Sequence, residues 1–118
     1  WDEIANAQLV KNSVVQFWAD EENTKKGMSQ GAKVLISTAK KAYLDMQYDS
    51  TSVFGLHWAG YIEVDTGYNW DPLDQVAGIT RNQILGIEAP LWSETVSEMD
   101  HIEYLVFPRL PGYAEIGW

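Results

Sequence analysis

The fold is decided by the stretch Ile84-Leu-Gly-Ile-Glu-Ala-Pro-Leu-Trp-Ser-Glu94. It begins with a short apolar run, which fits a strand buried on both faces, as in the parallel sheet of an α/β protein. Glu88, Trp92 and Glu94 follow this strand, with Pro90 interrupting the run. In α/β barrels the carboxyl ends of the strands carry the ligand site. An indole ring with carboxylates at that end suits a sugar, which offers C–H faces and hydroxyl groups.

Two more strands are predicted upstream of this stretch. Residues 14–18 are apolar and end in Trp18, and residues 33–37 form a similar run. Between them a helix is predicted over residues 22–30, with Gly31 just past its end. About twenty irregular residues then follow residue 37, and a loop of that length inside a compact domain is usually functional.

The predicted elements around the Ile84 strand are shorter. Residues 61–71 are expected to form an excursion that folds back over the site, after which Asp71 caps a helical turn begun by Pro72. Ser97 is expected to cap a helix that ends at Pro108. The apolar face of that helix comprises Ile102, Leu105 and Val106. At the ends of the chain, residues 1–4 are interpreted as the tail of one element and residues 114–118 as the start of another.

The order of elements is strand, helix, strand, long loop, strand, helix. This alternation predicts parallel strands joined by right-handed crossovers. No repeat or linker divides the 118 residues, so one domain without an internal boundary is expected. A parallel sheet of this size leaves open edges, which indicates part of a larger closed sheet. The start at Trp1, without Met, is interpreted as a cut edge.

Composition excludes several classes of partner. Eight Lys and Arg against 17 Asp and Glu give a net charge of −9, which argues against nucleic acid and anionic membrane surfaces. The chain has no Cys and no apolar run long enough to span a membrane. His57 and His101 lack the spacing of metal ligands, and no phosphate-binding loop is present. No metal or cofactor is therefore expected.

The candidate site residues have ordinary interpretations as well as functional ones. A Trp at the end of a strand more often packs in the core, but its recurrence on successive strands favours a shared aromatic pocket. Tyr43 and Asp45 lie two apart, so an extended segment would point both to one side. Glu88 and Glu94 could form a glycosidase pair, but they lie six apart across Pro90, so the sequence does not determine whether they have either catalytic separation.

Several separated motifs resemble one family in the order expected. They are Trp1-Asp2-Glu3, residues 14–18, Ala42-Tyr-Leu-Asp-Met46, residues 85–94, and Phe107-Pro-Arg-Leu110 followed by Ala114-Glu115. Together they resemble the carboxyl-terminal part of the catalytic domain of bacterial β-N-acetylhexosaminidases, glycoside hydrolase family 20. The resemblance covers essentially the whole chain. It implies an α/β fold in which the chain supplies about the end of strand five to strand eight of a (β/α)₈ TIM barrel.

The resemblance also implies roles for single residues. Trp18, Trp58 and Trp92 resemble the walls around the substrate's N-acetyl group, and Trp1 is similar to another indole of that pocket. Tyr43 resembles the catalytic residue whose hydroxyl hydrogen-bonds the acetamide oxygen. The carboxylates that hold the sugar around O4 and O6 are matched by Asp45 and Glu94.

The family uses a substrate-assisted, retaining mechanism, in which the acetamide oxygen attacks the anomeric carbon. Its adjacent Asp-Glu pair, in a His-x-Gly-Gly-Asp-Glu context, is absent here. Asp2-Glu3 and Asp20-Glu21 are adjacent acidic pairs, but both follow Trp residues that match later strands. The early-strand Arg that binds sugar hydroxyls also has no counterpart. The chain is therefore expected to be inactive alone and to belong to an enzyme with its catalytic pair upstream.

The resemblance implies an exo-acting hydrolase of terminal β-linked GlcNAc or GalNAc. Its expected partners are a glycan or chitooligosaccharide and the remainder of the same catalytic domain. Bacterial members of the family are often secreted or attached to the cell surface, and some are cytoplasmic. Two alternatives stay open: a non-catalytic carbohydrate-binding module, and a retaining glycosidase that uses Glu88 and Glu94.

Overall fold

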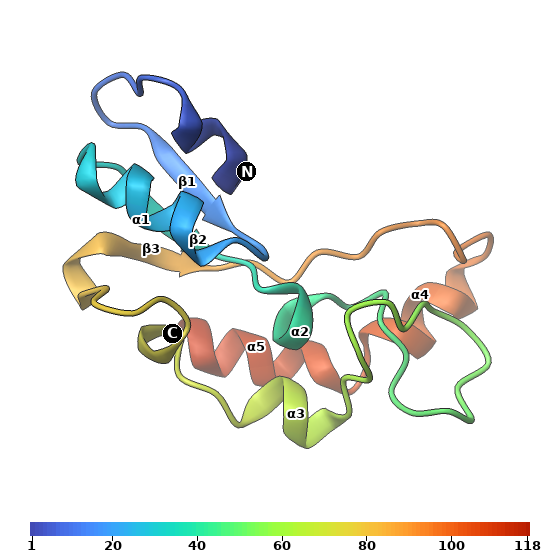
Figure 1. Cartoon of the computed structure of the whole chain (residues 1–118). Coiled ribbons are helices and arrows are strands. Elements are labelled where there is room, and N and C mark those ends of the chain that lie inside the picture. Colours follow the sequence, from blue (N-terminus) through green and yellow to red (C-terminus); the bar gives the residue numbers. More distant parts are fainter. The chain divides into compact units, whose positions relative to one another are not determined.

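The computed structural model describes residues 1–118 (Figure 1). The chain forms two compact units, each built from two segments. Unit 1 comprises Trp1–Thr38 and Asp71–Glu88, and unit 2 comprises Ala39–Trp70 and Ala89–Trp118. Each unit therefore has its own internal contacts and is described by itself.

Unit 1 contains a three-stranded parallel sheet. Its strands are β1 (Val14–Phe17), β2 (Lys33–Ile36) and β3 (Ile84–Ile87), in the order β1-β2-β3 (Figure 1). Val15 pairs with Val34 across β1 and β2, and both side chains are fully buried. The predicted parallel arrangement of these strands is thus confirmed.

The two faces of the sheet differ in burial within this chain. Leu85 in β3 is 58% exposed and Val14 in β1 is 46% exposed. The neighbouring positions Val15 and Ile36 are fully buried, as expected for side chains that alternate between the two faces. The elements of unit 1 therefore cover one face of the sheet more completely than the other.

Helix α1 (Glu21–Ser29) connects β1 to β2. Asp20 is its N-cap, and one carboxylate oxygen accepts a 2.9 Å hydrogen bond from the backbone N–H of Asn23. Gly31 lies just past the helix with a positive φ of 85°, as predicted for the residue that ends it. Gly27 allows α1 to approach β1 closely, because a Cβ there would lie 2.5 Å from Cγ2 of Val15.

Short 3-10 helices complete unit 1. One spans Asp2–Asn6, so the segment interpreted as the tail of an element forms a helical turn. A second spans Pro72–Asp74, and Asp71 caps it by accepting a hydrogen bond from the backbone N–H of Leu73, as predicted. A third spans Arg81–Gln83 and leads into β3.

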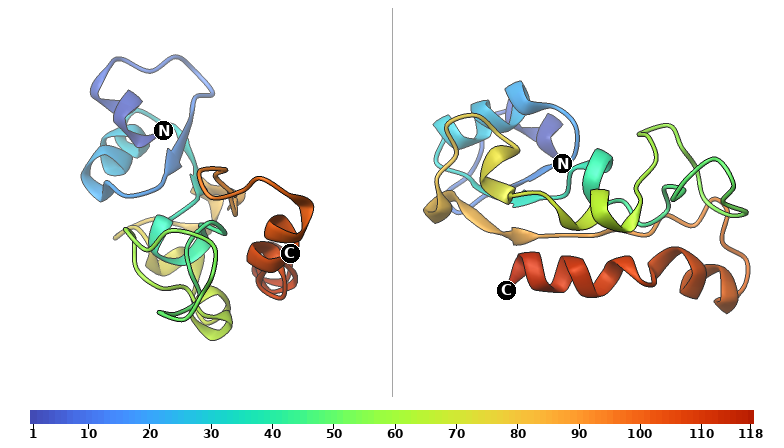
Figure 2. Two further views of the ribbon diagram at one scale, coloured as in Figure 1. Left: turned by 90° about the vertical axis from the view of Figure 1, so that its right-hand side faces the viewer. Right: turned by 90° about the horizontal axis from the view of Figure 1, so that it is seen from below.

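Unit 2 is mostly helices and loops. Its helices are α2 (Ala39–Ala42), α3 (Val64–Tyr68), α4 (Met99–Val106) and α5 (Arg109–Gly117) (Figures 1 and 2). The irregular segment predicted after residue 37 is present, but α2 occupies its start. The predicted excursion over residues 61–71 is instead the short helix α3, packed against α5. Gly67 permits this packing, because its missing Cβ leaves room for the Tyr113 hydroxyl.

The last two helices correct further predictions. Helix α4 begins one residue later than a Ser97 cap requires, with Glu98 at the N-cap and no side-chain capping bond. Residues 114–117, expected to begin a new element, are the last turn of α5. Proline is tolerated at a helix start, so Pro108 both ends α4 and precedes α5. No helix in the structure is both long and apolar enough to cross a membrane.

Candidate functional site

Tyr43 lies between two indole rings in unit 2. It directly follows α2 and is only 2% exposed. Its ring centroid is 6.0 Å from that of Trp58, edge to face, and 6.1 Å from that of Trp92. Trp58 is 57% exposed and Trp92 is 36% exposed, so each leaves part of its ring surface uncovered within this chain. The tyrosine is therefore held at the base of an open aromatic cluster.

Asp45 is buried two residues further along the same segment. Its Oδ1 atom has no hydrogen-bond partner within the chain. Burial raises the pKa of this carboxyl, and the charge of Glu94 raises it further. The backbone N–H of Trp92 and the charge of Arg109 act in the opposite direction on that pKa. Asp45 thus offers a buried acceptor beside an exposed carboxylate, Glu94.

Backbone hydrogen bonds join the loops that carry these residues. The N–H of Leu44 donates to the carbonyl of Pro90 at 2.8 Å, which links the Tyr43 segment to the Trp92 segment. The N–H of Leu56 donates to the carbonyl of Asp45 at 2.8 Å, which links it to the Trp58 loop. Three stretches that are distant in sequence are therefore fixed to one another without a regular sheet.

The buried guanidinium of Arg109 holds the same segment from α5. Arg109 is 2% exposed and donates to the carbonyls of four residues. The acceptors are Met46 at 2.9 Å, Ile62 at 3.0 Å, Leu44 at 2.6 Å and Leu105 at 2.6 Å. The planar guanidinium, with its five N–H donors in a fixed fork, suits such a convergent set of acceptors.

Unit 1 carries the other two predicted indoles. Trp1 and Trp18 meet edge to face with their ring centroids 5.8 Å apart. The indole N–H of Trp18 donates to Glu3 at 3.1 Å. Trp1 is 50% exposed and Trp18 is half-buried, so this pair also presents aromatic surface.

A buried carboxylate, Asp2, holds the loop that carries Trp18. Its Oδ2 accepts from the backbone N–H groups of Trp18, Ala19 and Asp20 at 3.3, 3.3 and 3.0 Å. Burial raises the pKa of Asp2, while these three hydrogen bonds lower it. Asp2 therefore accepts the backbone hydrogen bonds of the loop directly after β1, where no neighbouring strand pairs the backbone.

Glu88 lies at the carboxyl ends of the three strands. Its Oε2 accepts hydrogen bonds from the side chains of Gln16 and Ser37, the latter at 3.2 Å. These two residues come from β1 and from the end of β2. The glutamate thus joins the three strand ends of unit 1.

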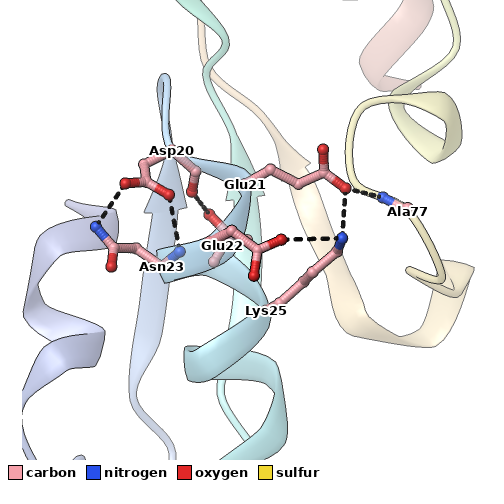
Figure 3. Close-up of polar contacts among 7 residues, drawn as sticks. Asp20, Glu21, Glu22, Asn23, Lys25 and Ala77 are labelled. Atoms are coloured by element: carbon pink, nitrogen blue, oxygen red, sulfur yellow. Dashed lines mark hydrogen bonds and ion pairs between the residues drawn. The ribbon is translucent and has the colours of Figure 1, made fainter.

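The second adjacent acidic pair, Asp20-Glu21, belongs to the start of α1 (Figure 3). The Asp20 carboxylate caps the helix through Asn23. Glu21 pairs with Lys25 at 2.8 Å and accepts from the backbone N–H of Ala77. The hydrogen bond from Lys25 is the main cause that lowers the pKa of Glu21. Both carboxylates are therefore engaged in ordinary helix-end contacts.

The two histidines lie outside any metal-like cluster. No group of three or more His, Asp or Glu side chains could hold a metal ion. His57 stacks on Tyr61, with ring centroids 5.8 Å apart. His101 is half-buried and stacks on Phe54 of the long loop, with ring centroids 3.9 Å apart.

The structure groups the sequence-predicted residues by unit. Tyr43, Asp45, Trp58, Trp92 and Glu94 belong to unit 2, and Trp1 and Trp18 belong to unit 1. Sequence reasoning missed the functions of Asp2 and Arg109. The sequence offers a signal only for Arg109, which is a lone charge in the apolar motif Phe107-Pro-Arg-Leu110. Their contacts with distant backbone groups leave no mark in a sequence.

Comparisons with known proteins agree on one family. Residues 1–118 match the model described as glycosyl hydrolase family 20, catalytic domain. The chain is 38% identical to a β-N-acetylhexosaminidase of Cellulomonas fimi, with 100% of the chain and 24% of the relative aligned. All of it superposes on 25% of the N-acetyl-β-hexosaminidase of Streptomyces plicatus, with a TM-score of 0.94 and 40% identity.

A third comparison includes a bound sugar. A GH20 exo-β-N-acetylglucosaminidase of Vibrio harveyi, solved in complex with N-acetylglucosamine, matches with a TM-score of 0.85 and 32% identity. The match covers 100% of the chain and 19% of that protein. The chain thus spans about a quarter or less of the length of these relatives.

Proposed function

The chain belongs to glycosyl hydrolase family 20, and we propose that it is part of an exo-acting β-N-acetylhexosaminidase. The observation that carries this proposal is the cluster in unit 2. There Tyr43 lies between Trp58 and Trp92, and Asp45 presents a buried acceptor beside Glu94. Apolar walls with a few oriented polar groups are what a sugar-binding pocket requires.

The proposed substrate is a terminal β-linked GlcNAc or GalNAc residue on a glycan or chitooligosaccharide. The bound N-acetylglucosamine of the Vibrio harveyi relative supports this choice. In the proposal, Trp18, Trp58 and Trp92 surround the N-acetyl group, and Trp1 adds a further indole. Asp45 and Glu94 hold the hydroxyl groups on the opposite side of the sugar. The unpartnered Oδ1 of Asp45 is suited to accept from such a hydroxyl.

The proposed reaction is substrate-assisted. The acetamide oxygen attacks the anomeric carbon as the bond to the leaving oxygen breaks, and a proton donor protonates that oxygen. The product of this step is an oxazolinium ion, which water opens with retention of configuration. The indoles restrict the acetamide to an attacking geometry, and the Tyr43 hydroxyl holds the reacting oxygen in place by a hydrogen bond.

The proton donor and its neighbouring carboxylate are proposed to lie in the remainder of the same catalytic domain. The engagement of both acidic pairs in this chain supports that assignment. Asp2 is fully buried against three backbone N–H groups, and Asp20 caps α1. Hydrogen bonding to its own backbone N–H is the main cause that lowers the pKa of Glu3, whereas a general acid needs a raised pKa.

The barrel segment supplied by this chain is proposed to run from about the end of strand five to strand eight. The exposed face of β3 and the long match to other GH20 proteins support this placement. A secreted or cell-surface location completes the proposal.

Hydrolysis of 4-nitrophenyl N-acetyl-β-glucosaminide tests the proposal, with 4-nitrophenyl β-glucoside as the control that lacks the acetamide. The parent protein should hydrolyse the first compound and not the second. The 118-residue polypeptide alone should hydrolyse neither, because it lacks the donor; general acid catalysis contributes about 10²- to 10⁴-fold. Robust turnover by the polypeptide alone would contradict the assignment of the catalytic pair.

The same assay separates the two alternatives. Sugar binding by the parent protein without hydrolysis would indicate a carbohydrate-binding module. Hydrolysis of both compounds, lost in Glu94→Gln and restored by azide, would indicate a retaining glycosidase with a carboxylate nucleophile.

A further inference from the structure

Arg109 is a buried cation whose hydrogen bonds surround one of the proposed sugar-binding residues. The two carbonyls on either side of Asp45, those of Leu44 and Met46, both accept from its guanidinium. These contacts join the start of α5 to the Tyr43 segment, more than 60 positions away in sequence. A third acceptor, Ile62, belongs to the segment that follows the Trp58 loop.

The guanidinium is fixed in turn by its own surroundings. Its Cζ atom lies 4.0 Å from the centroid of the Tyr48 ring, in a cation–π contact. The Tyr48 hydroxyl donates to the carbonyl of Phe107 at 2.7 Å, which ties this ring to the end of α4. Arg109 is therefore clamped between an aromatic face and four carbonyls, with little freedom to change its position.

The Leu44 carbonyl fixes the peptide plane between Leu44 and Asp45, and the Asp45 carbonyl, which accepts from the N–H of Leu56, fixes the next plane. The Met46 carbonyl fixes the plane after that, so Arg109 holds the backbone on both sides of this segment, and Tyr43 precedes Leu44 directly. Because the segment forms no regular ladder beyond a single bridge at Met46, side-chain donors must supply the pairing. Displacements of about 1 Å in such supports can cost about 100-fold in rate.

We propose that Arg109 is a positioning residue for the proposed reaction, acting through Tyr43 and Asp45 without touching the substrate. This inference rests on the function proposed for the site. It assigns to a buried residue of α5 control over the direction of the tyrosine hydroxyl and the aspartate carboxylate. The replacement Arg109→Lys keeps the charge but loses the planar fork, so it cannot satisfy the same carbonyls together.

The test is a double-mutant cycle in the parent protein, with kcat and KM measured for 4-nitrophenyl N-acetyl-β-glucosaminide. Arg109→Lys is expected to lower kcat by about 10- to 100-fold. In a Tyr43→Phe background the same replacement should lower kcat by only about threefold, because the tyrosine hydroxyl is gone and only the effect through Asp45 remains. Equal losses in both backgrounds would overturn the inference and leave Arg109 a stabiliser of the fold.

A matched control separates positioning from stability. Val76→Ala removes methyl groups from a fully buried side chain of unit 1, so it should lower the unfolding midpoint while leaving kcat unchanged. All rates are measured at a temperature well below the lowest unfolding midpoint among the variants. A kcat loss in Val76→Ala as large as that in Arg109→Lys would overturn the inference.

If Arg109→Lys does not fold, two replacements of Tyr48 test the same inference with less disturbance of the fold. Tyr48→Leu removes the ring under the guanidinium, and Tyr48→Phe keeps it. The first should lower kcat by about tenfold with the same dependence on Tyr43, and the second should stay within about threefold of the parent. Equal effects of the two replacements would overturn the inference. If Tyr43→Phe itself turned over at the parent rate, both the proposed function of Tyr43 and this inference would fall.

Discussion

The two units hold their aromatic residues by opposite means. In unit 1 a buried anion, Asp2, accepts from three backbone N–H groups of the loop that carries Trp18. In unit 2 a buried cation, Arg109, donates to four backbone carbonyls around the segment that carries Tyr43. Unit 1 has a sheet that pairs most of its strand backbone, so it needs help only where a strand ends. Unit 2 lacks such a sheet, and one side chain supplies what a neighbouring strand would.

The difference predicts that the cation contributes more to stability than the anion. Arg109→Met in the parent protein should lower the free energy of unfolding by about 3–5 kcal/mol, because four buried carbonyls lose their donor. Urea unfolding followed by tryptophan fluorescence measures this loss. A loss below about 1 kcal/mol would mean that unit 2 is held by its apolar contacts alone.

Asp2→Asn is the corresponding change in unit 1. The amide keeps one acceptor oxygen for the three convergent N–H groups but places an NH₂ donor where the other buried oxygen has no hydrogen-bond partner, so a loss of about 1–3 kcal/mol is expected. The same urea experiment measures it. If this loss exceeded that of Arg109→Met, the ranking of the two units would be reversed.

Close packing in both units depends on glycine, which provides a matched pair of changes. A Cβ at Gly67 would lie 2.6 Å from the Tyr113 hydroxyl, and one at Gly27 would lie 2.5 Å from Cγ2 of Val15. Each Gly→Ala change should cost about 1–3 kcal/mol. Adding Tyr113→Phe should recover part of the loss at Gly67 and none at Gly27. Thermal unfolding of the single and double variants measures this, and equal recovery at both glycines would refute it.

Asp45→Asn should change stability the least, and it should raise stability where the preceding changes lower it. Burial raises the pKa of Asp45 in the folded state, so its ionised form opposes folding above that pKa. Below the unfolded-state value, near 3.8, the carboxyl is protonated in both states and opposes nothing. The variant should therefore unfold at a higher temperature than the parent at pH 7, with the gain shrinking towards pH 3.5. A gain that grows as the pH falls would contradict the sign.

Much of the sheet could be predicted from sequence, because its signals are local. The apolar runs at Val14, Lys33 and Ile84 mark the three strands, and Asp71-Pro72 and Gly31 mark helix ends by their own chemistry. The helix around Gly67 was missed because glycine and aromatic residues do not favour an isolated helix. Its packing against Tyr113 of α5, a tertiary contact, is what stabilises it.

In the candidate site, too, residues in local motifs could be predicted and residues that act through distant contacts could not. Tyr43, Asp45 and Trp92 could be named from motifs, since they belong to short stretches with a strong family resemblance. The residues that orient them could not be named, because Arg109 acts through backbone carbonyls at distant positions. A carbonyl is present in every residue, so neither composition nor spacing identifies such acceptors.

The most direct test of this account is the turnover of Tyr43→Phe in the parent protein, measured with 4-nitrophenyl N-acetyl-β-glucosaminide. The account predicts that kcat falls by about 10²-fold, the cost of losing the hydrogen bond that orients the reacting oxygen. The unfolding midpoint should change by less than about 4 °C, because the ring and its contacts with both indoles stay in place. A kcat near that of the parent protein would contradict the function assigned to Tyr43, and with it the account of the site.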